Sequence, residues 1–258
     1  MRKVPYARSR TQDLVRKMVG MTEKSIHPEN SISPRHPIHP VEALLVVDVQ
    51  VAFVSGDEAV PHAARVLDRS RDLLDRARAA GALIVHLQND GPPGAVDEPG
   101  TPGWELRLPV VPGPREKVVR KTDDDGFVDT PLGDLLTGAG VEALAVCGVL
   151  SEMCVSATAR AALVRGFRVV LPHHAHATYD IPAAPGISEV VPAAMSSRAA
   201  EWALGDEIEI VARSAEVTFA DVASPVPPEQ PAPTLPSPAA DASRRSGLPD
   251  GSRPAPFA

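Results

Sequence analysis

The sequence has only two cysteines in 258 residues, Cys147 and Cys154, and no apolar run near the roughly 18 residues that a membrane-spanning helix requires. The first thirty residues lack the apolar core of a secretory signal. Positive charge is also scarce, because 26 Lys and Arg stand against 33 Asp and Glu, for a formal net charge of -7. We therefore expect a cytoplasmic protein with free thiols, and neither a nucleic acid nor a membrane as its partner.

The two ends of the chain differ in composition from its middle. Residues 1–40 begin with a basic stretch and close with the proline-punctuated SPRHPIHP, and residues 224–258 are dominated by Pro, Ala and Ser. Segments with so few large apolar side chains cannot repay the entropy lost on ordering, so we expect both to be disordered. A weak amphipathic helix or an interaction arm is an alternative for the basic stretch. The folded domain is predicted over residues 41–223.

Short apolar runs alternate with helical patterns inside this domain. Six runs rich in Val, Leu and Ile are predicted to be strands: 42–49, 81–88, 116–121, 141–149, 167–172 and 206–212. Apolar residues recur every three or four positions over 63–77, and Pro192 is predicted to lie in the first turn of a last helix. Gly81, Gly140 and Gly166 each stand between a helical pattern and a strand, where left-handed caps are expected. The pattern predicts an α/β fold, a doubly wound, six-stranded parallel sheet with helices on both faces.

The functional site of such a sheet lies beyond the carboxyl ends of its strands. Asp48 closes the first run, Lys121 closes the third, and Cys154 follows the fourth in the first turn of a predicted helix. A helix N-terminus and a nearby ammonium both favour a thiolate, so we expect a lowered thiol pKa for Cys154, with Asp48 as proton acceptor. Taken singly, each residue has a structural alternative: a packed thiol, a strand-end cap and a surface lysine. Cys147, inside an apolar strand, is expected to be a packing residue.

Three segments resemble the signature blocks of the isochorismatase-like cysteine hydrolases, a family that includes nicotinamidases and related amidases. They are DVQVAF at 48–53, RKTDDDGFVDTPL at 120–132 and CGVLSEMCVSATARAALVRGFRVV at 147–170. The likeness extends over essentially all of 41–223. It implies a six-stranded parallel sheet and a catalytic triad at Asp48, Lys121 and Cys154.

The resemblance also implies a mechanism, in which Asp48 takes the thiol proton, Cys154 attacks an amide carbonyl, and water hydrolyses the thioester. Backbone around Val149, Leu150, Met153 and Cys154 is expected to form the oxyanion hole, with the N–H groups of Met153 and Cys154 as donors. The family further implies a non-proline cis peptide near Val149 and Leu150. The expected activity is hydrolysis of an amide C–N bond in a small molecule.

The sequence departs from the family pattern at Val51 and Ala52, where relatives have Asn and Asp, and at His174, where an Asp is common. These changes put in doubt a polar contact near the site and the role of that acid. Nicotinamidases hold a metal with an Asp-x-His and a second His. Neither HLQND at 86–90 nor the histidines of 173–176 has that spacing. We therefore expect no metal and no other cofactor.

Substrate choice is expected to depend on two loops rich in Gly and Pro, at 89–106 and 176–192. The candidate pocket residues are Phe53, Trp104, Glu105, Phe127, His176 and Tyr179, although packing roles would also explain them. Asp97, Glu98 and the acidic run 123–125 would give the pocket an acidic rim that favours a cationic substrate, unless they are simply solvated surface.

Within the family, residues 176–210 resemble streptothricin hydrolases, which open the streptolidine lactam of a polycationic antibiotic. That lactam is the favoured substrate, with antibiotic resistance as the implied role. One alternative is an amidase for a nicotinamide-like or carbamoyl compound, and another is a non-catalytic binding or assembly subunit. Because relatives commonly form dimers, a homodimer is expected.

Overall fold

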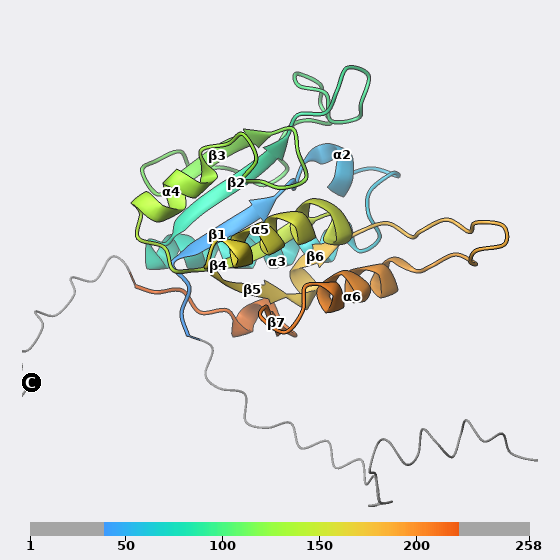
Figure 1. The fold of residues 1–258 in the computed structure, drawn as a ribbon. Helices are drawn as coiled ribbons and strands as arrows, with labels where there is room; N and C mark the ends of the chain where they lie inside the picture. Colours follow the sequence, from blue (N-terminus) through green and yellow to red (C-terminus); the bar gives the residue numbers. More distant parts are fainter. Residues whose placement is uncertain (1–38, 222–258) are drawn as a thin grey trace, which may run out of the picture.

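The computed structural model describes residues 39–221, so the disorder predicted for 1–40 and 224–258 falls almost entirely outside the described residues. Figure 1 shows strands side by side in one sheet, with helices on both faces. The strands are β1 (Ala43–Val47), β2 (Leu83–Asn89), β3 (Glu116–Lys121), β4 (Ala143–Val149), β5 (Arg168–Pro172), β6 (His176–Ala177) and β7 (Glu209–Val211). The helices are α2 (Val51–Val54), α3 (Ala63–Ala80), α4 (Leu132–Gly138), α5 (Ser156–Val164) and α6 (Ala193–Ala203), with short helical turns η1 (Ser151–Val155), η2 (His173–Ala175) and η3 (Ser214–Glu216).

The sheet has the order β3-β2-β1-β4-β5-β7, and every pairing between neighbouring strands is parallel. The order reverses direction beside β1, as in a doubly wound sheet. All six predicted strands are present, which confirms the predicted fold. The short β6, which pairs with the end of β4, was not predicted, because two residues show no periodic pattern.

Side chains alternate between two cores on the two faces of the sheet. From β1, Leu44 and Val46 join the core beneath α3, whereas Leu45 and Val47 join the core beneath α4 and α5. Figure 1 shows α3 on one face and α4 and α5 on the other. Cys147 is fully buried in the α3 core, where burial raises its thiol pKa to about 12. It is therefore the packing residue that its apolar strand predicted.

Two glycines need a backbone conformation that other residues rarely adopt. Gly81 ends α3 at φ 69°, where its N–H donates to the carbonyl groups of Ala77 and Arg78, so the predicted helix cap is confirmed. Gly148 has φ 125°, and a Cβ at this position would lie 2.0 Å from the carbonyl oxygen of Val47. The absence of a side chain at Gly148 therefore lets β1 and β4 approach closely at their carboxyl ends. No helix in residues 39–221 is long and apolar enough to cross a membrane.

Candidate active site

Three side chains from different strands meet beyond the carboxyl ends of the sheet. The Nζ of Lys121, the last residue of β3, lies 2.8 Å from Oδ2 of Asp48, which follows β1. The same Nζ lies 3.3 Å from Sγ of Cys154, in the η1 turn after β4. Because β2 separates β3 from β1, the Lys121 and Asp48 side chains together bridge about 10 Å, two strand spacings. The structure thus brings together the three residues that the sequence analysis selected.

Asp48 is held in an unusual conformation. Its backbone has φ 49°, in the left-handed region, and its side chain is only 3% exposed. While Oδ2 accepts from Lys121, Oδ1 is buried with no hydrogen-bond partner among the described residues. Burial raises the pKa of Asp48, and the Lys121 ammonium only partly offsets this. A carboxylate with a raised pKa and an unoccupied oxygen is suited to accept a proton.

The thiol of Cys154 is partly exposed, and it donates to Oδ1 of Asp124 at 3.3 Å. Burial raises its pKa, the Asp48 carboxylate raises it further, and Lys121 lowers it by less. The expectation of a lowered thiol pKa is therefore wrong, because two carboxylates and the loss of solvent outweigh one ammonium. The free enzyme holds a neutral thiol, so attack requires transfer of its proton to a base.

Lys121 is buried, and the loss of water alone would lower its pKa. Its interactions with the Asp48 carboxylate and the Cys154 sulfur outweigh that effect and raise its pKa, so the ammonium stays charged. It also donates to the Asp123 carbonyl at 3.1 Å and to Oδ1 of Asn89 at 3.3 Å. These acceptors fix the cation between the acid and the thiol.

Asn89, the last residue of β2, was not predicted as a site residue. Its Nδ2 donates to Oδ2 of Asp97 at 2.7 Å, which turns Oδ1 toward Lys121. Its backbone is held by Gln50, whose amide accepts from Asn89 N at 2.9 Å and donates to Asn89 O at 2.9 Å. One feature of the sequence could have indicated a role for Asn89. It is a polar residue at the end of an apolar strand, and that strand lies between the strands that lead to Asp48 and Lys121.

The nucleophile segment begins with a cis peptide bond between Val149 and Leu150, as the resemblance implies. The η1 turn is interrupted at Met153, which has φ -106° and ψ -109°. The N–H groups of Met153 and Val155 donate to the Leu150 carbonyl at 3.2 and 3.1 Å. The N–H of Met153 is therefore already engaged, and it is not the free oxyanion donor that we expected.

Comparisons with known proteins agree with this geometry. A family model described as the isochorismatase domain matches residues 42–185. The chain is 80% identical over 188 residues to a streptothricin hydrolase of Streptomyces noursei. The aligned region covers 73% of this chain and 75% of that relative. An isochorismatase from Pseudomonas putida KT2440 has a similar structure, with a TM-score of 0.63, 30% identity, and coverage of 69% of this chain and 93% of that one. A cysteine hydrolase from Pseudomonas syringae pv. phaseolicola has a TM-score of 0.61 at 25% identity, and covers 70% of this chain and 93% of that one.

The chain belongs to the isochorismatase family. It is a hydrolase of that family, and the predicted family resemblance is confirmed. The match spans β1 to the middle of the loop between β6 and α6, and so it includes Asp48, Lys121 and Cys154.

Four of the predicted pocket residues are partly or fully exposed. Phe53 packs at the edge of the α3 core, and the Tyr179 hydroxyl donates to the Glu58 carbonyl at 3.0 Å. The Trp104 indole N–H donates to Asp90 at 2.8 Å, and Glu105 is exposed. Their role in binding substrate stays a prediction.

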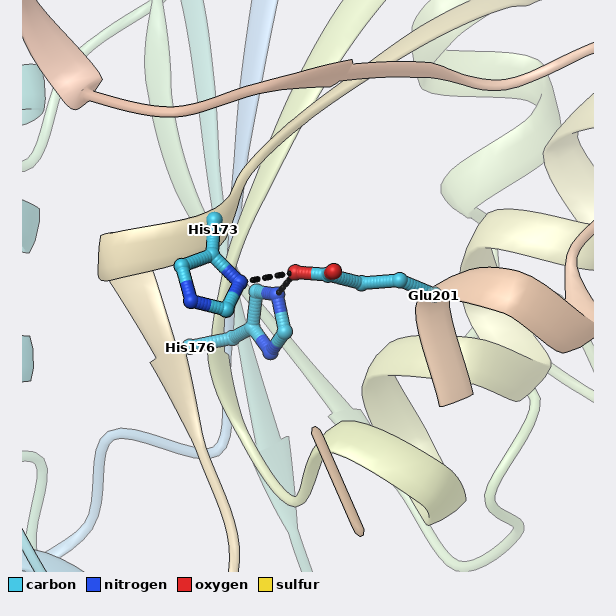
Figure 2. A group of neighbouring side chains, drawn as sticks. All are labelled: His173, His176 and Glu201. Atoms are coloured by element: carbon cyan, nitrogen blue, oxygen red, sulfur yellow. Dashed lines mark hydrogen bonds and ion pairs between the residues drawn. The ribbon is translucent and has the colours of Figure 1, made fainter. Parts of the chain in front are cut away.

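Two predicted pocket residues are buried instead. Phe127 is 7% exposed and lies in the core beneath α4 and α5, where its ring centroid is 6.3 Å from that of Phe167. His176 is 1% exposed, and its Nδ1 lies 2.8 Å from Ser151 Oγ. Its Nε2 lies 3.0 Å from Glu201 Oε1 (Figure 2). Because neither ring is open to solvent, we correct these two predictions.

The departures from the family pattern have local explanations in the backbone. The N–H groups of Val51 and Ala52 donate to the carbonyl groups of Glu105 and Gly103 at 2.8 and 2.9 Å, which ties α2 to the 89–106 loop without polar side chains. His174, on the η2 turn, is partly buried, and burial and neighbouring cationic groups lower its pKa. A neutral imidazole thus stands where the family resemblance led us to expect an acid.

Proposed function

We propose that this isochorismatase-family hydrolase opens the streptolidine lactam of streptothricin through a thioester on Cys154. The observation that supports this substrate is the identity of 80% and 78% to two streptothricin hydrolases, which far exceeds the 27–34% identity to curated relatives with other names, such as ureidoacrylate amidohydrolases. The cysteine, its buried carboxylate and the ammonium between them support the chemistry.

The proposed reaction begins with proton transfer from Cys154 to Asp48. Sγ attacks the lactam carbonyl carbon, and we expect the oxyanion to lie at the N-terminal end of the η1 and α5 segment, with the Cys154 N–H as its donor. The Met153 N–H, which donates to the Leu150 carbonyl, is not assigned this role. The C–N bond then breaks and Asp48 returns its proton to the leaving amine. Water, deprotonated by Asp48, hydrolyses the thioester, so the product is the substrate plus one water.

Lys121 has an electrostatic role in this scheme. Its ammonium keeps Asp48 ionised despite burial, and it offsets the negative charge that develops on Sγ as the proton leaves. Among the described residues, it is the cation hydrogen-bonded to both groups.

The acidic residues near the thiol support a cationic substrate. Asp124 is exposed and lies 3.3 Å from Sγ, and Glu105 and Glu152 are also exposed. Asp97, predicted to be part of this acidic rim, is instead buried against Asn89. An acidic surface beside the nucleophile raises the local concentration of a polycation.

The test is to incubate the purified protein with streptothricin and measure the product by mass spectrometry. We expect addition of one water by the wild type and by Cys147→Ala, and none by Cys154→Ala. Since Cys147 is the other cysteine but packs in the core, it is the matched control. Turnover by Cys154→Ala would refute the thioester mechanism.

A panel of simple amides, including nicotinamide and N-carbamoyl compounds, tests the alternative substrates. Hydrolysis of one of these compounds, with streptothricin left unchanged, would favour the amidase alternative. The structural similarity to an N-carbamoylsarcosine amidase of Thermoplasma acidophilum supports testing it. No turnover of any amide would favour a binding subunit. A cytoplasmic location and a homodimer are part of the proposal, and light scattering of the purified protein tests the homodimer.

A further inference from the structure

A second polar cluster joins the turn after β5 to α6. Oε1 of Glu201 lies 2.6 Å from Nδ1 of His173 and 3.0 Å from Nε2 of His176. Figure 2 shows the two rings reaching the same carboxylate oxygen from the η2 and β6 side, while Glu201 projects from α6. The three ligand atoms lie within 4.8 Å of one another, and within residues 39–221 this is the one such group of His, Cys, Asp or Glu side chains.

Glu201 and His176 are almost completely removed from solvent, since each side chain is 1% exposed. Neighbouring charges matter strongly at such a buried position. The Oε1 oxygen of Glu201 is buried there and faces one ring nitrogen of each histidine.

The far side of His176 is arranged as in many metal-ligating histidines. Its Nδ1 lies 2.8 Å from Ser151 Oγ, which lies 2.9 Å from Ser197 Oγ. Metal ligation through Nε2 requires the proton to be on Nδ1, donated to an outer partner. The two hydroxyl groups can rotate so that Ser151 accepts from His176 and donates to Ser197. The pocket therefore accommodates the tautomer that a metal needs.

The distances are near those that hold an ion. Ligands about 2.0 Å from a tetrahedral zinc lie about 3.3 Å from one another, so the present 2.6 and 3.0 Å contacts with Glu201 would open by less than about 1 Å. The two histidine nitrogens, which lie within 4.8 Å of each other, would close by at most about 1.5 Å. His173 is 36% exposed, which leaves an entry path and a fourth position for water. Two histidines and one glutamate with an open position form a known zinc ligand set.

We propose that His173, His176 and Glu201 bind a divalent transition-metal ion of the zinc type, which ties α6 to the turn after β5. We expected no metal from the sequence, because the histidines lack the spacing of the nicotinamidase site. The third ligand, Glu201, lies 25 residues beyond His176 in the chain, so no short motif includes it. The site is separate from Asp48, Lys121 and Cys154, so the proposal does not depend on the proposed function.

Arg198 is the competing group at this site. Its NH1 lies 3.4 Å from the other Glu201 oxygen, Oε2, and its side chain is 57% exposed. A guanidinium there reduces the attraction of the carboxylate for a cation. We therefore expect Arg198→Ala to bind the ion several-fold more tightly than the wild type.

The test uses the full-length protein, freed of metal with EDTA and titrated with Zn²⁺ against a chromophoric chelator. We expect one tightly bound ion per chain, and visible absorption bands when Co²⁺ is used instead. The same ion should bind to Cys154→Ala, because the active-site thiol is not a ligand. His173→Asn and Glu201→Gln should weaken binding at least tenfold, whereas His174→Asn, the matched control beside the cluster, should leave the affinity unchanged.

Two outcomes would overturn the proposal. One is the lack of a stoichiometric ion in the wild type, and the other is equal affinity in the wild type and in both ligand variants. Circular dichroism reports whether each variant is folded. Because His173 is partly exposed, its variant gives a valid measurement even if Glu201→Gln does not fold.

Discussion

The Nζ of Lys121 lies 2.8 Å from Oδ2 of Asp48, and these side chains are 0% and 3% exposed. A charge pair withdrawn from water in this way is costly to break, because removal of one partner leaves the other charge buried and uncompensated. The geometry of the site therefore makes the lysine necessary for the ionisation of the aspartate.

Lys121→Met should reduce kcat/KM about 100-fold or more, a typical contribution of a positioned base. Without the ammonium, burial raises the pKa of Asp48 further, so the carboxyl group is protonated and cannot accept the thiol proton. Steady-state kinetics on streptothricin measures the effect. Lys117→Met, on the same strand and partly exposed, is the matched control and should be nearly fully active. Equal activities of the two variants would contradict the assigned role of Lys121.

Asp48→Asn should have opposite effects on alkylation and on catalysis. The Asp48 carboxylate raises the pKa of Cys154, so its removal increases the thiolate fraction at neutral pH. We expect faster labelling of Cys154 by iodoacetamide than in the wild type, together with loss of hydrolysis. Labelling rates from pH 6 to 10, with the modified residue identified by peptide mass spectrometry, give the thiol pKa. An unchanged or slower labelling rate would show that Asp48 does not act on the thiol in this way.

Gly148→Ala should disrupt both the fold and the site. An alanine Cβ would lie 2.0 Å from the Val47 carbonyl oxygen, at a φ of 125°. Strain and overpacking of this kind typically cost about 3 kcal/mol or more together. Gly140→Ala is the control, because its φ of 68° is also positive but nothing lies within 4 Å, so a cost of about 1 kcal/mol is expected. Urea denaturation compares the two, and similar midpoints would refute the close approach of β1 and β4.

Glu116 should make stability depend on pH at the acid end. Burial alone would raise its pKa, but hydrogen bonds from Arg78, the Val111 N–H and His86 lower it to about 2 from an ordinary value of 4.5. The carboxylate therefore stabilises the fold fully above pH 4.5, and this contribution of about 3 kcal/mol is lost as the pH falls toward 2.

The comparison of Glu116→Gln with the wild type measures this linkage. The difference in unfolding free energy should be largest near pH 7 and shrink below pH 4.5. The exposed Glu207→Gln is the control and should change stability by less than about 0.5 kcal/mol at any pH. A difference for Glu116→Gln that does not vary with pH would contradict the lowered pKa.

The sequence predicted the sheet and the three central side chains because both depend on local patterns. Apolar runs mark buried parallel strands, and the residues that end them must lie at one edge. The sign of the Cys154 pKa shift could not be predicted, because it depends on burial and then on the Asp48 carboxylate, with a smaller effect of Asp124, 30 residues away in the chain.

The polar partners of the site were missed for a similar reason. Asn89 becomes a site residue only when the following loop folds back and places Asp97 against its amide. Phe127 and His176 were predicted to line the pocket, yet packing against Phe167 and hydrogen bonding to Glu201 bury them. Such contacts between distant segments leave no periodic signal in the chain.

Lys121 is carried by β3, the strand at the outer edge of the sheet, with a neighbour on one side only. Edge elements open more readily than central ones, through partial unfolding that leaves the remaining structure intact. The cation would then be withdrawn from the acid and the thiol while β1 and β4 stay paired. As temperature or denaturant concentration rises, turnover should therefore be lost before the rest of the molecule unfolds. Local unfolding of β3 alone thus sets the highest temperature or denaturant concentration at which this enzyme is active.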